Sequence, residues 1–209
     1  EMGHQPPYDK KDIRDVMERV QGVTYRQPVS LGDGLSAIFH EASHILGSAI
    51  IEVTSGHNGQ EKRVAFTGDL GNPPTILLNP IEYPHGVDYA VIESAYGDRL
   101  HENRGIRRQM LLDTVVQTVK RGGVLMMPSF AIERTQELLL ELDTLFEQGQ
   151  LPQVPFFVDS PLAINMTKVY GTFSRYFKPE AVKILEDNNG LFNFPWLKFT
   201  PTVEASKAI

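Results

Sequence analysis

The sequence contains no cysteine, and this absence excludes two kinds of site. A disulfide-stabilised scaffold is ruled out, and a bound metal ion would need histidine and carboxylate ligands in place of thiolates. Proteins of a reducing compartment carry no structural disulfides. We therefore expect a cytoplasmic protein whose metal site, if it has one, is built from His, Asp and Glu.

Long apolar runs and an excess of basic charge are also missing. No stretch approaches the roughly 18 apolar residues of a membrane-spanning helix, and residues 1–15 lack the apolar core of a signal peptide. We expect no membrane partner. The net charge is −6, whereas a protein that coats nucleic acid nonspecifically is usually basic. Binding of nucleic acid would therefore need a local basic patch.

The 209 residues suffice for one large domain or two small ones, and their texture changes near residue 97. Before it, a short amphipathic helix is predicted over 9–20. Runs rich in β-branched residues then predict strands over 35–40, 48–55, 62–68 and 87–94. Turn residues at 56–60 join the second and third of these strands into a hairpin. We expect residues 1–97 to be a β-rich unit.

Beyond residue 97 the patterns of helix and strand alternate. The predicted helices cover 103–120, 131–149, 161–173 and 179–188, and the predicted strands cover 123–129 and 154–160. Such alternation is typical of a mostly parallel sheet with helices on its faces. The expected fold class is α/β, with a second unit over residues 98–209.

Two polar residues flank the predicted hairpin. His44 lies just before its first strand and Asp69 just after its second. An antiparallel hairpin brings these two positions to one rim of the sheet. Glu93, at the end of the next strand, reaches the same rim if that strand runs parallel to 62–68. On spacing alone, a hydrogen-bonded structural histidine and a turn-forming aspartate are a more common explanation of this pattern than a metal site.

The chain resembles a known family through several short motifs. They read, in order, "SHILGS", "FTGDLG", "VIESAYGDRLHE", "PSFAIERTQELL" and "VDSPLA". These motifs are similar to those of the β-CASP branch of the metallo-β-lactamase superfamily, whose members are RNA- and DNA-processing nucleases such as ribonuclease J. The resemblance implies that residues 1–97 are the end of a metallo-β-lactamase half and residues 98–209 part of a β-CASP domain.

Functional roles follow from the resemblance, residue by residue. His44 matches a zinc-ligand histidine, and Asp69 matches the aspartate that bridges two zinc ions. Glu93 matches the acidic catalytic residue of the motif that is specific to the β-CASP branch. Ser43 and Ala95 stand where the family commonly has Gly and Thr. Neither of these departures removes a ligand.

One large departure concerns the remaining zinc ligands. The family's "HxHxDH" motif has no counterpart in residues 1–38, and its late histidine motifs are absent as well. We therefore expect the chain to be an internal piece of a longer enzyme. Two ligands do not close a zinc site, so we expect the chain alone to bind zinc weakly or not at all and to leave RNA uncut.

The second unit offers candidate contacts for RNA phosphates. Ser129 and Ser160 are predicted where strands lead into helices, and Arg134 in the first turn of a helix, where anions are favoured. Each has an alternative: Arg134 pairs with Glu137 or Glu141 on its own helix, and Ser160 caps a helix.

Arginines gather in residues 98–109, namely Arg99, Arg104, Arg107 and Arg108. They form either a local basic patch or a solvated helix face. Tyr96 beside them could stack on a base or be buried.

Three functions remain open at this point. The first is a fragment of a zinc-dependent ribonuclease acting on single-stranded RNA. The second is a non-catalytic RNA- or protein-binding module. The third is a small-molecule hydrolase, which the β-CASP-like segment disfavours. Pairing between chains would cover exposed sheet edges, so a homodimer is compatible with all three.

Overall fold

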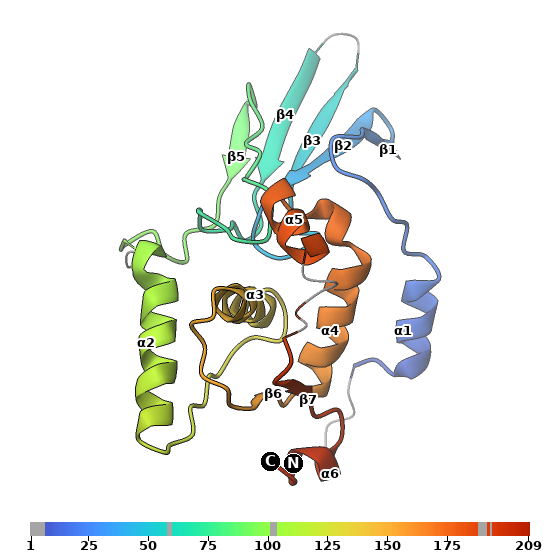
Figure 1. Ribbon diagram of the computed structural model, residues 1–209. Coiled ribbons are helices and arrows are strands. Elements are labelled where there is room, and N and C mark those ends of the chain that lie inside the picture. Colours follow the sequence, from blue (N-terminus) through green and yellow to red (C-terminus); the bar gives the residue numbers. More distant parts are fainter. Residues whose placement is uncertain (1–6, 58–59, 101–103, 188–191, 193) are drawn as a thin grey trace.

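The computed structural model describes residues 7–57, 60–100, 104–187, 192 and 194–209. Figure 1 shows a twisted sheet above a group of helices, with a second, small sheet beneath them. The predicted α/β class is confirmed, because a five-stranded mixed sheet and several helices are present in one chain.

The large sheet contains the predicted hairpin. Its strands follow one another in chain order: β1 (Val29–Gly32), β2 (Leu35–Glu41), β3 (Ala49–His57), β4 (Gln60–Phe66) and β5 (Tyr89–Val91). Strands β1 to β4 pair antiparallel, and β5 runs parallel to β4. The parallel pairing of β5 is the condition under which Glu93 was predicted to reach the rim of His44 and Asp69.

The helices of the second part lie close to their predicted positions. They are α2 (Arg107–Lys120), preceded by the 3₁₀ turn η1 (Arg104–Ile106), then α3 (Arg134–Glu147), α4 (Pro161–Thr172), η2 (Ser174–Tyr176), α5 (Pro179–Asp187) and α6 (Val203–Ser206). In Figure 1, α3 lies between α2 and α4. None of the helices in the described ranges combines the length and the apolar character that a membrane crossing requires.

The predicted strand over 123–129 is wrong. The parallel sheet of this part consists of β6 (Phe156–Val158) and β7 (Leu197–Phe199). Residues 123–130 adopt no regular structure, and Val124 and Met126 are 89% and 82% exposed. A β-prone sequence becomes a strand only where a neighbouring strand accepts its hydrogen bonds, and no strand of the described residues pairs with this run.

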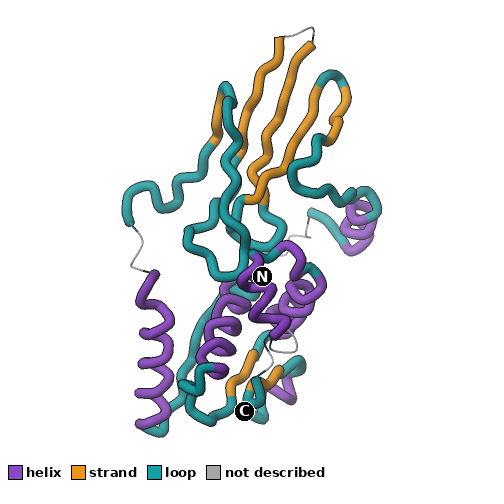
Figure 2. Tube along the Cα trace, turned by 45° about the horizontal axis from the view of Figure 1, so that its top comes forward, coloured by secondary structure: helices purple, strands orange, loops and turns teal. Residues whose placement is uncertain are grey.

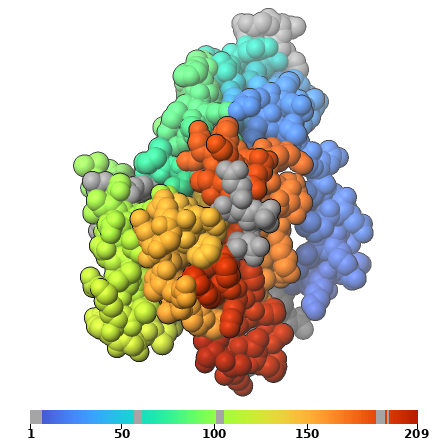
Figure 3. All heavy atoms as spheres, in the orientation of Figure 1, coloured from blue at the N-terminus to red at the C-terminus, as the bar shows by residue number. Residues whose placement is uncertain are grey.

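The N-terminal helix α1 (Lys10–Met17) begins at a capping box, in which Asp9 and Asp12 bond each other's backbone amides. Its predicted apolar face is present as a pattern, but Ile13, Val16 and Met17 remain exposed. Figure 3 shows this blue segment on the outer flank of the molecule. The helix therefore adds nothing to the core.

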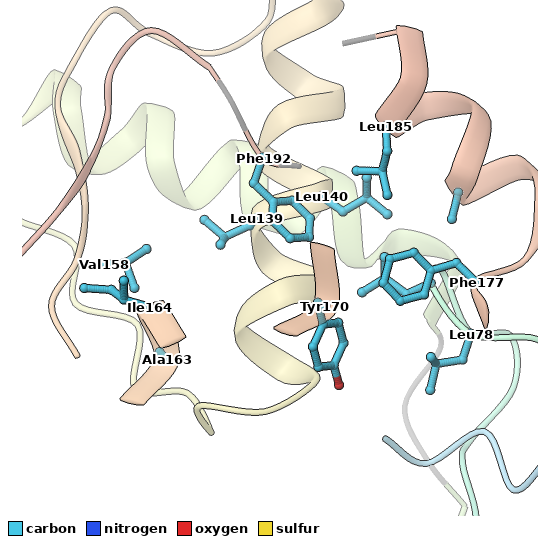
Figure 4. Packing of buried hydrophobic residues seen from close by; sticks show 12 residues of the cluster. Leu78, Leu139, Leu140, Val158, Ala163, Ile164, Tyr170, Phe177, Leu185 and Phe192 are labelled. Carbon is cyan, nitrogen blue, oxygen red and sulfur yellow. The ribbon is translucent and has the colours of Figure 1, made fainter. Parts of the chain in front are cut away.

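The main core joins the two parts of the chain. Leu77 and Leu78, in the connection between β4 and β5, are fully buried against α3, α4 and α5. Lys178 N donates to Leu77 O at 2.9 Å. Figure 4 shows this cluster and labels Leu78, Leu139, Leu140, Val158, Ala163, Ile164, Tyr170, Phe177, Leu185 and Phe192. The loops next to this connection are thus fixed between the sheet and the helices.

Candidate functional site

His44 lies in the turn between β2 and β3, which we call the His44 loop (residues 42–48). The hydroxyl of Ser48 accepts hydrogen bonds from His44 N at 3.1 Å and from Ile45 N at 3.2 Å. Gly47 has a positive φ of 88°, a conformation that glycine adopts without strain. Figure 2 shows the loops after β2 and β4 gathered where the sheet meets the helices.

Ser43 explains why the family commonly has glycine before the motif histidine. Its φ is 57°, in the left-handed region where a side chain costs ~1 kcal/mol or more. Two hydrogen bonds compensate: Ser43 N donates to Glu41 Oε1 at 2.7 Å, and Ser43 Oγ donates to Asn79 O at 2.6 Å. These two hydrogen bonds offset the free-energy cost of a side chain at a positive φ, a cost that glycine would not have.

Asp69 follows β4 and lies beside His44. Gly71 N donates to Ala42 O at 2.9 Å, which fixes the loop after β4 against the His44 loop. His44 Nε2 and Asp69 Oδ2 are 3.7 Å apart, and the two side chains are 43% and 77% exposed. The structure therefore brings together the two residues that the hairpin geometry predicted to share a rim, on a face open to solvent.

Glu93 lies at the same rim but faces the backbone. Thr67 connects the two strand ends, because its N–H donates to Val91 O at 3.0 Å and its hydroxyl accepts from Glu93 N at 3.1 Å. The Glu93 carboxylate accepts hydrogen bonds from Leu70 N at 3.4 Å and from Ala95 N at 2.8 Å. Glu93 therefore holds the loop of Asp69 to the end of β5.

The His44–Asp69 pair suits a zinc ion in chemistry and spacing. Zinc binds imidazole nitrogen and carboxylate oxygen at about 2.0–2.2 Å, so atoms 3.7 Å apart can contact one ion from two sides. Within the described ranges, however, no group of three or more His, Asp and Glu side chains could hold a metal ion. The pair fits part of a zinc site and does not complete one.

The predicted phosphate contacts are engaged within the chain. Arg134 pairs with Glu137 three residues along α3, and Ser160 Oγ accepts from Ala163 N at 3.2 Å as the N-cap of α4. Ser129 Oγ accepts from Thr135 Oγ1 at 3.2 Å. In the described part of the chain, no hydrogen bond or ion pair links these residues to His44 or Asp69. For Arg134 and Ser160 the structural alternative is therefore present.

Three of the four arginines of residues 98–109 contact acidic or aromatic neighbours, and the side chain of Arg104 lies outside the described part of the structure. Arg107 and Arg108 lie against Glu141 of α3. Arg99 stands over the ring of Tyr96 at 4.9 Å and lies 3.6 Å from Asp98. Tyr96 is exposed, so the alternative of a buried tyrosine is wrong.

Sequence reasoning missed Glu133, and it did not reveal which backbone Gly71 approaches. A Cβ on Gly71 would lie 1.8 Å from Ser43 O, a contact that depends on how the two loops meet. Glu133 is buried and has a φ of 62° at the start of α3. Both residues lie inside the motifs "FTGDLG" and "PSFAIERTQELL". Their place in these motifs is the sequence feature that could have pointed to a structural role.

Comparison with known protein sequences shows which proteins this chain resembles. Residues 135–209 match the family described as Beta-Casp domain. Ribonuclease TTHA0252 from Thermus thermophilus is 30% identical over 205 residues, covering 98% of this chain and 46% of the relative. Residues 135–209 belong to the β-CASP domain family. The predicted resemblance of the chain to the β-CASP branch of the metallo-β-lactamase superfamily is confirmed.

Other β-CASP relatives come from archaea and plants. The RNase J-like protein of Methanocaldococcus jannaschii is 30% identical over 184 residues, covering 86% of this chain and 42% of the relative. Cleavage and polyadenylation specificity factor subunit 3-I of Arabidopsis thaliana is 33% identical over 168 residues, covering 79% of this chain and 24% of the relative. The chain spans less than half the length of each of these relatives.

Proposed function

We propose that this chain contributes part of the active site of a zinc-dependent ribonuclease that hydrolyses phosphodiester bonds in single-stranded RNA. His44 and Asp69 are the proposed zinc ligands, and Asp69 and Glu93 the proposed catalytic residues. The observation that carries the proposal is the His44–Asp69 pair, 3.7 Å apart on an open rim. The ribonuclease names of the relatives support it.

The chain's own residues would bind and orient in this reaction. When bound, zinc supplies a water molecule whose pKa is lowered to about 7. Asp69 offers two carboxylate oxygens, which suits a position between two ions. Glu93 keeps Asp69 in place through its bonds from Leu70 N and Ala95 N. Residues 1–97 are proposed as part of the metallo-β-lactamase half, and residues 98–209 as part of the β-CASP domain.

Among the proposed RNA contacts, Arg99 has the best support. Its guanidinium is exposed and stacks on the exposed Tyr96, an arrangement that can receive both a base and a phosphate. Ser129, Arg134 and Ser160 remain predicted contacts, because among the described residues none of them stands over an aromatic ring as Arg99 stands over Tyr96. The cytoplasmic location and the homodimer also stay predictions.

Cleavage of labelled single-stranded RNA tests the proposed function. We expect the product of the complete reading frame in which this chain occurs to cut RNA with zinc present. Asp69→Asn should lower the rate at least ~100-fold, because a neutral amide cannot replace a bridging carboxylate. Asp15→Asn, at an exposed aspartate of α1, serves as the control and should leave the rate unchanged.

A second candidate function is a non-catalytic RNA- or protein-binding module. It is favoured by the incomplete set of metal ligands among the described residues. RNA that is bound but not cut by the zinc-loaded protein would support this module and contradict the ribonuclease. Cleavage that survives Asp69→Asn would contradict the proposed role of Asp69.

A further inference from the structure

Glu133 is a buried carboxyl group that the proposed chemistry does not use. Its residue is 8% exposed, and its Oε1 has no hydrogen-bond partner among the described residues. The backbone is in an unusual conformation, with φ 62° and ψ −59°, and the side chain does not cap α3. A buried carboxyl group with one unpaired oxygen, on a residue in a strained backbone conformation, costs folding free energy.

Glu133 is connected to the His44 loop through one tyrosine. Tyr170 of α4 donates its hydroxyl to Glu133 Oε2 at 2.6 Å. The same hydroxyl oxygen accepts a hydrogen bond from Leu46 N at 3.2 Å. In Figure 4 the ring of Tyr170 packs within the core while its hydroxyl points out of the apolar cluster. A continuous bond path thus runs from α3 through α4 to the loop that carries His44.

The other hydrogen bonds of the His44 loop are made within the loop or with residues of the sheet-forming part of the chain. Ser48 bonds the amides of His44 and Ile45, and Tyr25 Oη donates to Ser48 O at 2.9 Å. Leu46 N, two residues from His44, is instead held by Tyr170, 124 positions away in the sequence. The far end of the loop therefore depends on the helical part.

We propose that Glu133 and Tyr170 are positioning residues that hold the His44 loop, so that α3 and α4 fix where His44 is presented. We call the hydrogen-bond path Glu133–Tyr170–Leu46 the latch. The effect of the latch on zinc binding rests on the proposed function, whereas its effect on the Leu46 amide does not.

The latch carries a titratable group whose charge changes near neutral pH. Burial raises the pKa of Glu133 to about 7, and the neighbouring Glu137 carboxylate acts in the same direction. The groups that oppose it are the Tyr170 hydroxyl of α4, Arg134 of α3 and the Leu46 amide. Ionised Glu133 accepts a stronger bond from Tyr170, which makes the tyrosine oxygen a better acceptor for Leu46 N–H.

The Leu46 amide is the direct reporter of the latch, and its hydrogen exchange and chemical shift can be followed by NMR on the 209-residue chain. Tyr170→Phe keeps the buried ring and removes the hydroxyl, so Leu46 exchange should speed up roughly tenfold. Tyr89→Phe, at an exposed tyrosine of β5, is the matched control and should leave Leu46 unchanged.

Glu133→Gln separates the latch from a general structural role. Glutamine still offers an oxygen to Tyr170, so Leu46 should stay protected at pH 6, whereas Glu133→Ala should expose it. In the unmodified chain the Leu46 shift should titrate with a midpoint near pH 7, and Glu133→Gln should abolish this titration. Folded Tyr170→Phe protein with unchanged Leu46 exchange, or a Leu46 titration that persists in Glu133→Gln, would overturn the proposal.

A zinc arm distinguishes failure of the latch from failure of the proposed function. If zinc shifts the His44 ring signals of the unmodified chain, Tyr170→Phe should need several-fold more zinc for the same shift. If zinc leaves the His44 ring signals unchanged while the Leu46 amide responds to the variants as predicted, the latch is supported and His44 is not a zinc ligand in this chain. An equal zinc requirement in both proteins would refute the link between latch and ligand.

Discussion

Gly71→Ala is expected to lower the free energy of unfolding by about 3 kcal/mol. A Cβ at this position would lie 1.8 Å from Ser43 O and 2.3 Å from Ser43 C. These are backbone atoms of a buried residue that is held by Glu41 and Asn79. Since neither side can give way, the loop of Asp69 must separate from the His44 loop.

Urea denaturation of the 209-residue chain measures this effect, with Gly22→Ala as the matched control. A Cβ on Gly22 meets nothing within 4 Å, and its φ is not positive, so alanine there should change stability by less than ~0.5 kcal/mol. Equal stability of the two variants would show that the loops around His44 and Asp69 do not meet as described.

The free energy of unfolding is expected to fall as the pH rises from 5.5 to 8. Burial raises the pKa of Glu133 from 4.5 to about 7, so between these values the folded protein binds more protons than the unfolded chain. Stability from this group is complete below pH 4.5 and is lost as the pH rises through 7. At ~1.4 kcal/mol per unit of pKa difference, the loss over the whole range from below pH 4.5 to pH 8 is ~3 kcal/mol, of which ~2 kcal/mol falls between pH 5.5 and 8.

Comparing the unmodified chain with Glu133→Gln isolates the contribution of Glu133 to this pH dependence. The variant should lose most of the fall in stability between pH 5.5 and 8. A smaller slope should remain, since burial also raises the pKa of Glu41. Identical pH profiles for the two proteins would mean that Glu133 is already ionised in the folded state at pH 5.5.

The rim of the site could be predicted because it follows from local topology. A hairpin fixes where its strands begin and end, so His44 and Asp69 were predicted to meet, and they lie 3.7 Å apart. Glu93 followed once its strand was assumed parallel to β4, which the pairing of β5 confirms. Short-range pattern is sufficient where neighbouring strands are neighbours in sequence.

Features that depend on distant partners could not be predicted. Residues 123–129 have the sequence of a strand, yet no strand within the described residues pairs with them. Leu77 and Leu78 lie in a connection without regular structure, but they are buried by helices about 60 to 110 positions away. The Glu133–Tyr170 bond likewise joins residues whose proximity arises only from packing of α3 on α4.

The zinc affinity of the 209-residue chain tests the central claim most directly. The claim is that His44 and Asp69 form part, and only part, of a zinc site in the described chain. Equilibrium dialysis with zinc should give binding weaker than micromolar, and His44→Ala should weaken it further. Stoichiometric zinc that persists through dialysis, and that is unaffected by His44→Ala and Asp69→Ala, would contradict the account.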